Sequence, residues 1–341
     1  MAKKDLKIED IGEFGFIRSI MNDCHFSTEK LIKGIGDDCA VIGPYKDKVF
    51  LITTDLLVED VHFILGRIPP EHLGEKAVAV NLSDIAAMGG NALHLFLSVA
   101  IPRSMSLETI HLIYRGIKTM CRRYNVNILG GDTSSSPEKL MINVTVIGDA
   151  TEKEVLYRSG ARAGDAIYIT DTLGNSAAGL KLIKEELFAP DNLASSLIDA
   201  HNRPVPFLEA GRMIARSRLA SAMIDLSDGL LSDLQHICEA SGVGARLFHD
   251  SLPLSEELKA LAEINNLDPY EFVLSGGEDY RLLITIPGKN LESFQKLFEK
   301  QKSCPIYHVG EITKELGTKM TRPDGKEELL EVTGFDHFVR T

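Results

Sequence analysis

The sequence lacks an excess of positive charge and has few cysteines. Its 341 residues include 37 Lys and Arg against 49 Asp and Glu, which leaves a formal net charge of -12. Because nucleic acids and anionic membranes attract basic surfaces, this balance disfavours either of them as the main partner. The five cysteines are widely spaced and form no C-x-x-C pair, so neither a disulfide framework nor a zinc site is indicated.

Signals for export and membrane insertion are also missing. The first ten residues carry acidic side chains and no apolar run, which argues against a secretory signal. The longest uncharged stretch, 85–102, contains Gly89, Gly90 and His94, so it is not a membrane span. The 44% hydrophobic content matches a globular protein with a full core. We therefore expect a cytoplasmic enzyme with no nucleic-acid or membrane partner.

Apolar runs alternate with helical patterns along the chain, which predicts a layered α/β fold. The expected strands are 49–55, 95–101, 140–147, 166–170, 223–225 and 281–287. The expected helices are 71–88, 106–124, 176–186, 229–241 and 290–302. The segment 148–165 is rich in charge and glycine and follows a strand, so we expect two domains, 1–150 and 151–341.

Aspartates stand beside glycines and at the ends of expected strands. They are Asp37, Asp38, Asp55, Asp132, Asp225 and Asp228. Such positions converge on the rim of a sheet, where ligands usually bind, and hard carboxylate oxygens suit Mg²⁺ held together with phosphates. For any one of these aspartates taken alone, a role in a turn or a helix cap is the favoured interpretation.

Asp84 favours the metal interpretation. It lies in the otherwise apolar helix 77–88, where an unpaired carboxylate is costly to bury and Asp is a poor helix former. Asn81 is three residues earlier and shares its face of the helix. A bound metal would explain this polar notch.

The two common nucleotide-binding motifs are absent. There is no G-x-x-x-x-G-K-[ST] loop, and Gly242-Val-Gly244 lacks the third glycine of a dinucleotide fingerprint. The segment 170–179 follows a strand and opens a helix, which leaves two interpretations open. Its amides face a phosphate, or it is a plain turn capped by Ser176 or Asn175. The similar turn 274–280 is expected to expose Glu278 and Asp279.

Other reactive side chains give weaker signals. The histidines have no metal-ligand spacing, although His62 is expected on the same rim as Asp55. The negative charge of Asp38 disfavours a thiolate at Cys39, so thiol catalysis is not expected. Arg158 fits a phosphate contact or a surface ion pair.

Seven motifs in order resemble the thiamine-monophosphate kinase family, from about Gly12 to Phe338. They are Gly36-Asp-Asp38, Thr53-Thr-Asp55 with Val61-His-Phe63, Val80-Asn-Leu-Ser-Asp84, Gly130-Gly-Asp132, Asp225-Leu-Ser-Asp-Gly229, Ser275-Gly-Gly-Glu-Asp-Tyr280 and Gly334-Phe-Asp-His-Phe338. The family's pattern is broken at three positions. Asp60 and Asp171 stand where glycine is usual, and Asn175 replaces a frequent Asp.

The resemblance implies a fold shared with aminoimidazole ribonucleotide synthetase and selenophosphate synthetase, with an N-terminal half that forms a homodimer. It implies ATP-dependent phosphorylation of thiamine monophosphate to thiamine diphosphate with several Mg²⁺ ions. Implied metal ligands are Asp38, Thr53, Thr54, Asp55, Asp84, Asp132, Asp225 and Asp228. Implied ATP contacts are Tyr114, Gly131, Asp132, Arg158 and Ser227, and implied contacts to thiamine phosphate are His62, Glu278 and Phe335.

This chemistry does not require a catalytic base. A phosphate monoester has a second pKa near about 6, so the acceptor is largely ionised at neutral pH. Mg²⁺ offsets the repulsion between two polyanions, and direct in-line transfer is expected without a phosphoenzyme. For Phe335, a contact to the cationic ring and a core plug are equally favoured. The alternatives for the whole chain are another enzyme of the same superfamily and a nucleotide sensor without turnover.

Overall fold

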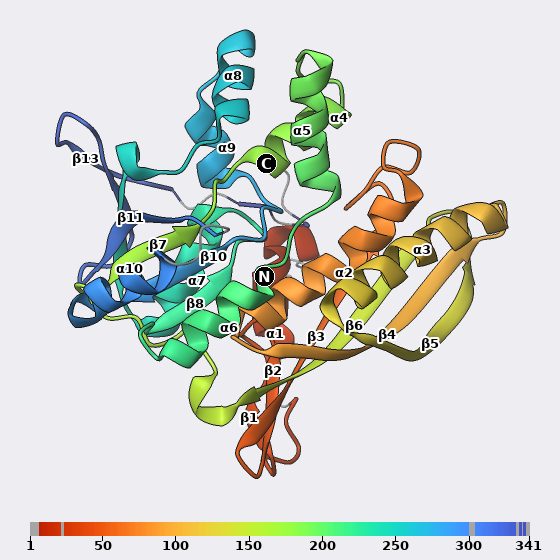
Figure 1. The fold of residues 1–341 in the computed structure, drawn as a ribbon, viewed down its shortest axis with the longest axis horizontal. Coiled ribbons are helices and arrows are strands. Elements are labelled where there is room, and N and C mark those ends of the chain that lie inside the picture. Colours follow the sequence, from red (N-terminus) through yellow and green to blue (C-terminus); the bar gives the residue numbers. More distant parts are fainter. Residues whose placement is uncertain (1–6, 22–23, 300–303, 332–333, 336, 339–341) are drawn as a thin grey trace, which may run out of the picture.

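The computed structural model describes residues 7–21, 24–299, 304–331, 334–335 and 337–338. Two sheets divide the chain (Figure 1). The first has the order β1-β2-β3-β6-β4-β5, with β1 (Leu31–Lys33), β2 (Ala40–Tyr45), β3 (Lys48–Val58), β4 (Asn91–Pro102), β5 (Asn127–Ser136) and β6 (Met141–Thr151). Its neighbours are antiparallel except β4 and β5, which run parallel.

The second sheet has the order β13-β12-β9-β11-β7-β10-β8. Its strands are β7 (Ala166–Thr170), β8 (Ala222–Asp225), β9 (Gly244–Phe248), β10 (Leu282–Ile286), β11 (Ile306–Thr313), β12 (Thr318–Thr321) and β13 (Glu327–Leu329). Here β12 and β9 are the parallel pair. A mixed α/β fold was predicted and is confirmed.

Helices cover both sheets (Figure 1). They are α1 (Gly12–Ile20), α2 (Pro70–Ala87), α3 (Leu107–Tyr124), α4 (Asn175–Ile183), α5 (Asp191–Asn202), α6 (Leu208–Ser217), α7 (Leu230–Ser241), α8 (Glu256–Asn265), α9 (Pro269–Ser275) and α10 (Leu291–Glu299). Short 3-10 segments are Ile8–Asp10, Glu152–Glu154, His249–Ser251 and Gly288–Asn290. No helix of the described ranges has the length and apolar character needed to cross a membrane.

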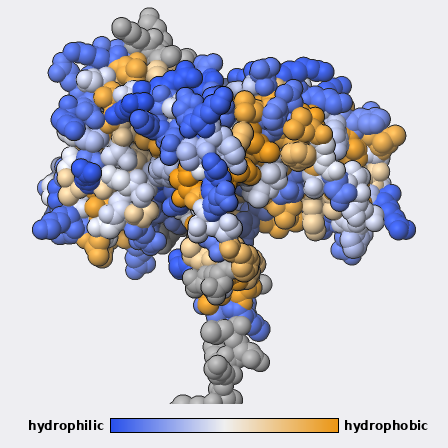
Figure 2. All heavy atoms as spheres, turned by 90° about the horizontal axis from the view of Figure 1, so that it is seen from below, coloured by the Kyte–Doolittle hydropathy of each residue, from blue (hydrophilic) through white to orange (hydrophobic). Residues whose placement is uncertain are grey.

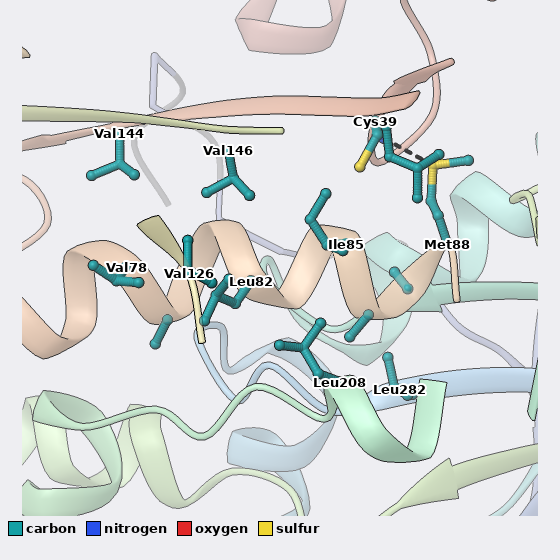
Figure 3. Close-up of a cluster of buried hydrophobic side chains, with 14 of the residues drawn as sticks. Cys39, Val78, Leu82, Ile85, Met88, Val126, Val144, Val146, Leu208 and Leu282 are labelled. Carbon is teal, nitrogen blue, oxygen red and sulfur yellow. Dashed lines mark hydrogen bonds between the residues drawn. The ribbon is translucent and has the colours of Figure 1, made fainter. Parts of the chain in front are cut away.

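Helix α2 lies between the two halves of the molecule. Figure 3 shows Val78, Leu82 and Ile85 of this helix between Val144 and Val146 of β6 and side chains of the second half. Leu208 of α6 and Leu282 of β10 belong to the same buried cluster. A helix packed on both sides is apolar all round, which explains the composition of 77–88. The central position of α2 makes Asp84 and Asn81 part of the junction between the halves.

The expected elements are largely confirmed, with differences at their ends. Helix α3 begins after Ser106, whose hydroxyl accepts a hydrogen bond from the Thr109 amide at 3.1 Å. Helix α4 ends at Ile183, three residues before the predicted end. Helix α10 ends at Glu299, and the rest of the predicted segment, 300–302, lies outside the described residues. Strand β5 was missed, because its Gly and Ser residues read as a turn.

One face of the first sheet is covered by α2 and α3, and the other carries large exposed apolar side chains. Phe50 and Leu56 of β3 and Phe96 of β4 are 36%, 47% and 40% exposed. Figure 2 views the molecule from below and shows hydrophobic residues gathered in the right-hand half, which holds this sheet in Figure 1. We call this surface, defined by Phe50, Thr54, Leu56, Phe96 and Ser98, the open face.

Candidate active site

A cavity of about 1070 Å³ lies between the two halves. The first half contributes β3, the segment before β2, and α2, and the second half contributes the segments that follow β8 and precede β10. Predicted site residues that line it are Asp38, Thr53, Thr54, Asp55, His62, Asp84, Arg158, Ser227, Asp228, Glu278 and Phe335. The cavity therefore collects residues that are up to about 300 positions apart in the chain.

Three carboxyl groups meet at one end of this cavity. One oxygen from each of Asp38, Asp84 and Asp225 lies within 4.8 Å of the others. The residues come from the segment before β2, from α2 and from the last position of β8. Thr53 donates its hydroxyl hydrogen to Asp84, and Ser83 donates to Asp225 at 2.5 Å. The predicted convergence of these aspartates is confirmed.

Strand β3 and helix α2 are also joined through Asp55. Its backbone amide donates to Asn81 Oδ1 at 3.2 Å, so the predicted polar notch on α2 faces this strand. The sequence placed Asp55 at a strand end, but β3 continues to Val58. Asp55 is therefore held within a strand, where its backbone is fixed on both sides.

The carboxyl cluster is short of positive charge. Burial, followed by the charges of Asp225 and Asp37, raises the pKa of Asp38 to about 7 even though Arg158 lowers it. Burial also raises the pKa of Asp55 and of Asp225 to about 6, and the pKa of Asp84 well above its ordinary value. Four acidic groups that resist ionisation together indicate a place for cations.

Arg158 is the cation that contacts this cluster. Its Nη2 and Nε lie 2.6 and 3.1 Å from Oδ1 of Asp38, and its amide donates to Asp37 Oδ1 at 3.2 Å. The other oxygen of Asp38, Oδ2, is buried and has no hydrogen-bond partner within the described residues. An orphaned carboxylate oxygen in a cluster of hard oxygen donors fits a divalent cation such as Mg²⁺.

A second group of potential ligands follows β8. Atoms of Asp228, Asp233 and His236 lie within 4.8 Å of one another. Oδ2 of Asp233 accepts from the amides of Asp228 and Gly229, both at 3.2 Å, and so orders the start of α7. The sequence analysis missed Asp233 and His236. Their spacing of three on a predicted helix that begins beside Asp228 was the available signal.

Another part of the cavity is lined by His62, Phe335 and Glu278, and it adjoins the acidic residues, because the amide of Phe335 donates to the backbone oxygen of Asp228 at 3.1 Å. Phe335 is 47% exposed, so it is not a core plug, and its ring lies 4.7 Å from that of His337. His62 is 4.9 Å from His337, and its Nδ1 accepts a hydrogen bond from the Val58 amide at 3.0 Å. Burial and then the charge of His337 lower the pKa of His62 to about 4. His62 is therefore a neutral imidazole whose proton is on Nε2.

Glu278 lies in the same part of the cavity. We had expected it on an exposed turn, but its side chain is largely buried. Its Oε2 lies 3.0 Å from Lys76 Nζ and 3.1 Å from His201 Nδ1. Burial would raise the pKa of Glu278, but Lys76 and His201 hold it below its usual value. Glu278 and Tyr280 have φ values of 64° and 52°, so this loop keeps two non-glycine residues in the left-handed region.

Asp279 was also expected to be exposed and is buried instead. Its carboxylate accepts hydrogen bonds from the amides of Gly174 at 2.6 Å and Ser176 at 3.3 Å. These are the first amides of α4, so the segment 170–179 offers them to a side chain of the protein. The phosphate interpretation of this segment was therefore wrong. Capping by Ser176 or Asn175 was also wrong, because the capping group is the carboxylate of Asp279, 105 positions after Gly174.

Four predicted residues do not line the cavity: Asp225, which is buried in the carboxyl cluster, and Tyr114, Gly131 and Asp132. Asp132 of β5 pairs with Ser98 of β4, and Ser98 pairs with Asn143 of β6. Asn143 pairs in turn with Leu56 of β3, so these four residues form one row across the sheet. Three strand spacings, about 14 Å, therefore separate Asp132 from β3 along the open face. The prediction that Asp132 converges with the other aspartates within one chain was wrong.

Two departures from the family pattern have a backbone explanation. Asp60 and Asp171 have φ values of 66° and 57°, in the region that glycine enters without strain. Both carboxylates are paired, Asp60 with Lys139 and Asp171 with Arg281. Asp tolerates this conformation better than most residues, so the chain follows the same path as with glycine. The third departure, Asn175, accepts a hydrogen bond from Ser255 at 2.6 Å.

The cysteine prediction is confirmed. Cys39 is buried, and burial followed by the charges of Asp84 and Asp38 raises its pKa well above the usual value. Its surroundings therefore disfavour the thiolate, as the sequence analysis expected from the charge of Asp38.

Comparison with known proteins gives consistent results across the chain. Residues 36–150 match the AIR synthase related protein N-terminal domain, and residues 162–322 match the corresponding C-terminal domain. The thiamine-monophosphate kinase of Buchnera aphidicola subsp. Schizaphis graminum is 37% identical over 97% of this chain and 100% of its own length. That of Bacillus subtilis is 35% identical, over 96% and 99%.

A solved structure is similar over the same length. The structure of AaThiL complexed with AMPPCP and TMP has a TM-score of 0.85 and 34% identity, and the match covers 98% of this chain and 100% of that one. Similarity of this extent covers the cavity and both sheets. The chain therefore belongs to the thiamine-monophosphate kinase family.

Proposed function

We propose that this protein transfers the γ-phosphoryl group of ATP to thiamine monophosphate, which yields thiamine diphosphate. The observation that carries the proposal is the cavity between the halves, which is lined by acidic residues of the carboxyl cluster and, beside them, by Phe335, His62 and Glu278. Its volume suits two ligands side by side. The similarity to relatives named thiamine-monophosphate kinase supports both substrates.

The carboxyl cluster would hold Mg²⁺. The residues of this chain's own cavity that would bind it are Asp38, Thr53, Thr54, Asp55, Asp84, Asp225 and Asp228. A metal ion held by these residues would supply charge neutralisation for the phosphates and alignment of the nucleophile with the leaving group. The raised pKa values of Asp38, Asp55 and Asp225 support this role, because burial disfavours their charged forms and a bound cation would offset that cost.

The remaining residues bind and orient the two substrates. Arg158 and Ser227 line the cavity beside the carboxyl cluster, where the phosphates of ATP would lie. His62 offers its Nε2 proton as a hydrogen-bond donor, and the ring of Phe335 offers a face to the cationic thiazolium. Glu278 presents a carboxylate to the same cation. None of these groups needs to remove a proton, because the acceptor phosphate is already ionised.

We also infer a homodimer that completes the active site. Thr54 lines the cavity and points to the open face, where it contacts Thr145 at 2.9 Å. Asp132 lies on the same face, but too far from β3 to share a ligand with Thr54 of its own chain. Two open faces packed against each other would bury Leu56 and Phe96 and bring Asp132 of one chain to the cavity of the other.

In this arrangement Gly131, which is beside Asp132 on β5, comes to the shared part of the site as well. Tyr114 is on α3, which covers the other face of the sheet. The two halves, 1–150 and 151–341, would then act as separate domains. The first would form the dimer and carry most of the metal ligands, and the second would close the cavity from the other side.

The reaction is tested by incubation of the purified protein with ATP, Mg²⁺ and thiamine monophosphate, followed by chromatography of the products. We expect thiamine diphosphate to form, and none when EDTA replaces Mg²⁺ or when unphosphorylated thiamine replaces thiamine monophosphate. Protein labelled covalently by γ-labelled ATP would contradict direct transfer. ATP binding without thiamine diphosphate would instead favour a nucleotide sensor.

A further inference from the structure

Lys76 on α2 is a lysine whose side chain is completely buried. A fully buried ammonium group is costly unless each of its three donors is satisfied. Three acceptors surround it, and they come from three segments. They are Glu278 Oε2 at 3.0 Å, the backbone oxygen of His62 at 3.4 Å and His201 Nε2 at 3.4 Å.

These contacts join both halves of the molecule at one end of the cavity. Lys76 and His62 belong to the first half, whereas Glu278 and His201 belong to the second. His201 is buried, and its Nδ1 lies 3.1 Å from both Ser176 Oγ and Glu278 Oε2. Since Nε2 accepts from Lys76, the proton of this imidazole is on Nδ1, where it faces Glu278 and Ser176.

Lys76 and His201 both contact the same oxygen of Glu278, Oε2. No described residue donates a hydrogen bond to the other oxygen, Oε1, and Glu278 lines the cavity with 22% of its side chain exposed. The backbone of Glu278 is left-handed, and its amide donates to the Ser227 oxygen at 2.7 Å. The carboxylate is thus fixed at its backbone and at one oxygen, with one oxygen left for a ligand.

We propose that Lys76, together with His201, is a positioning residue that keeps Glu278 ionised and aimed at the positively charged organic part of the substrate. The inference rests on the proposed function, because it assumes that thiamine monophosphate occupies this end of the cavity. Lys76 does not touch the phosphates or the carboxyl cluster. Its loss should therefore weaken the binding of thiamine monophosphate and leave the chemical step and ATP binding intact.

The pH dependence of binding distinguishes this role from a purely structural one. The titratable groups around Glu278 are Lys76 on α2, His201 on α5, His62 after β3 and Tyr280 in the same loop. The charge of Lys184 lowers the pKa of His201, and that of His337 lowers the pKa of His62. Without Lys76, burial raises the pKa of Glu278 with less to oppose it, so the carboxyl becomes protonated as the pH falls.

The test compares wild type with Lys76→Met, in which a side chain of similar length lacks the charge. We expect the KM for thiamine monophosphate to rise at least about tenfold, and kcat and the KM for ATP to change less than about twofold. The rise should grow between about pH 8 and about pH 6, relative to wild type measured at the same pH. Titration of the substrate's own phosphate affects both proteins equally.

The matched control is Glu75→Gln. Glu75 precedes Lys76 on α2 and binds Arg203 Nε at 2.9 Å, so it also links α2 to the segment after α5, but it does not line the cavity. We expect its KM for thiamine monophosphate to equal that of wild type. An equal rise in this control, an equal rise in the KM for ATP, or a pH profile parallel to wild type would overturn the inference.

If Lys76→Met does not fold, the double variant with Glu278→Gln provides the test, because the double variant leaves no buried carboxylate without a partner. In a Glu278→Gln background, the addition of Lys76→Met should change the KM for thiamine monophosphate less than about twofold. A further large rise would show that Lys76 acts by another route. If wild type forms no thiamine diphosphate, the proposed function itself has failed, which is a different result from an active enzyme that is indifferent to Lys76.

Discussion

At the scale of single residues, the site is built from buried groups whose charges do not balance. Asp84 stood out in the sequence, because a carboxylate in an apolar helix needs a partner, and the structure places it against Asp38 and Asp225. Lys76 lies on the same helix but was missed. A single lysine among alanines and valines looks like an exposed helix position, and only the approach of Glu278 from the other half makes it a buried ion pair.

The unbalanced carboxyls predict how the metal-free protein responds to pH. Asp38, Asp55 and Asp225 have folded pKa values of about 7, 6 and 6, above the unfolded value of about 4. Their protonated forms stabilise the fold at low pH, and this stability is lost as the pH rises through about 6 to 7. The buried histidines His62, His201 and His236 act in the opposite direction, because burial lowers their pKa to about 4. The contribution of the cluster is therefore measured against Asp38→Asn: with EDTA present, we expect the Tm of wild type to fall relative to that of this variant by roughly 2 °C between about pH 6 and about pH 8.

Mg²⁺ should reverse this effect, because it binds the ionised carboxylates. The gain in Tm on its addition is therefore expected to be larger at about pH 8 than at about pH 6, as measured by differential scanning calorimetry. A difference in Tm between metal-free wild type and metal-free Asp38→Asn that stays constant between these two pH values would contradict the account of the cluster.

At the scale of elements, α2 is the helix that packs against both halves of the molecule. It packs on the sheet through β3 and β6 and on α6 and β8 of the other half. The sequence predicted this helix well, because proline-free apolar spacing is a local signal. Strand β5 and the capping of α4 by Asp279 could not be predicted in the same way, since each depends on a partner that is distant in sequence.

Two glycines let α2 and α3 approach closely. A Cβ on Gly116 of α3 would lie 1.9 Å from the backbone oxygen of Glu71, and one on Gly74 of α2 would lie 2.0 Å from that of Ile113. Gly116→Ala must therefore push the helices apart, and we expect a loss of roughly 1–3 kcal/mol in the free energy of unfolding, measured by urea denaturation.

Gly288→Ala is the control for this substitution, because a Cβ there would meet nothing within 4 Å. Its free energy of unfolding should stay within about 0.5 kcal/mol of wild type. Equal stability of Gly116→Ala and wild type would show that the helices are not held at this distance by the two glycines.

At the scale of the whole molecule, the cavity needs both halves of one chain, and we propose that the open face packs on a second chain. The motif order in the sequence predicted the family, but not that Asp132 lies apart from the other aspartates of its own chain. The register of β3, β6, β4 and β5 shows this separation, which depends on strand pairing between segments that are distant in sequence.

A shared site predicts complementation between inactive subunits. Asp55→Asn and Asp132→Asn homodimers should both lack activity. When the two are coexpressed with different tags and form mixed dimers, one of the two sites is intact, so a random mixture should recover about a quarter of wild-type turnover. If Asp132 served its own chain, every mixed site would carry one substitution and no activity would return.

Asp55→Asn mixed with Asp84→Asn provides the control, since both residues line the cavity of the same chain. A mixed dimer of these two variants has one substitution in each of its two cavities, so neither site is intact. We therefore expect no recovery, and recovery in this pair would contradict the assignment of Asp132 to the neighbouring chain.

The most direct test of the account is the rate of thiamine diphosphate formation by Asp84→Asn, with Asp149→Asn as its control. Asp149 is also a buried carboxylate, but it is paired with Lys48 and lies outside the cavity. We predict that Asp84→Asn remains folded and loses at least about 100-fold in kcat, whereas Asp149→Asn retains turnover. Normal Mg²⁺-dependent turnover by a folded Asp84→Asn enzyme would contradict the central claim that this carboxyl cluster drives the phosphoryl transfer.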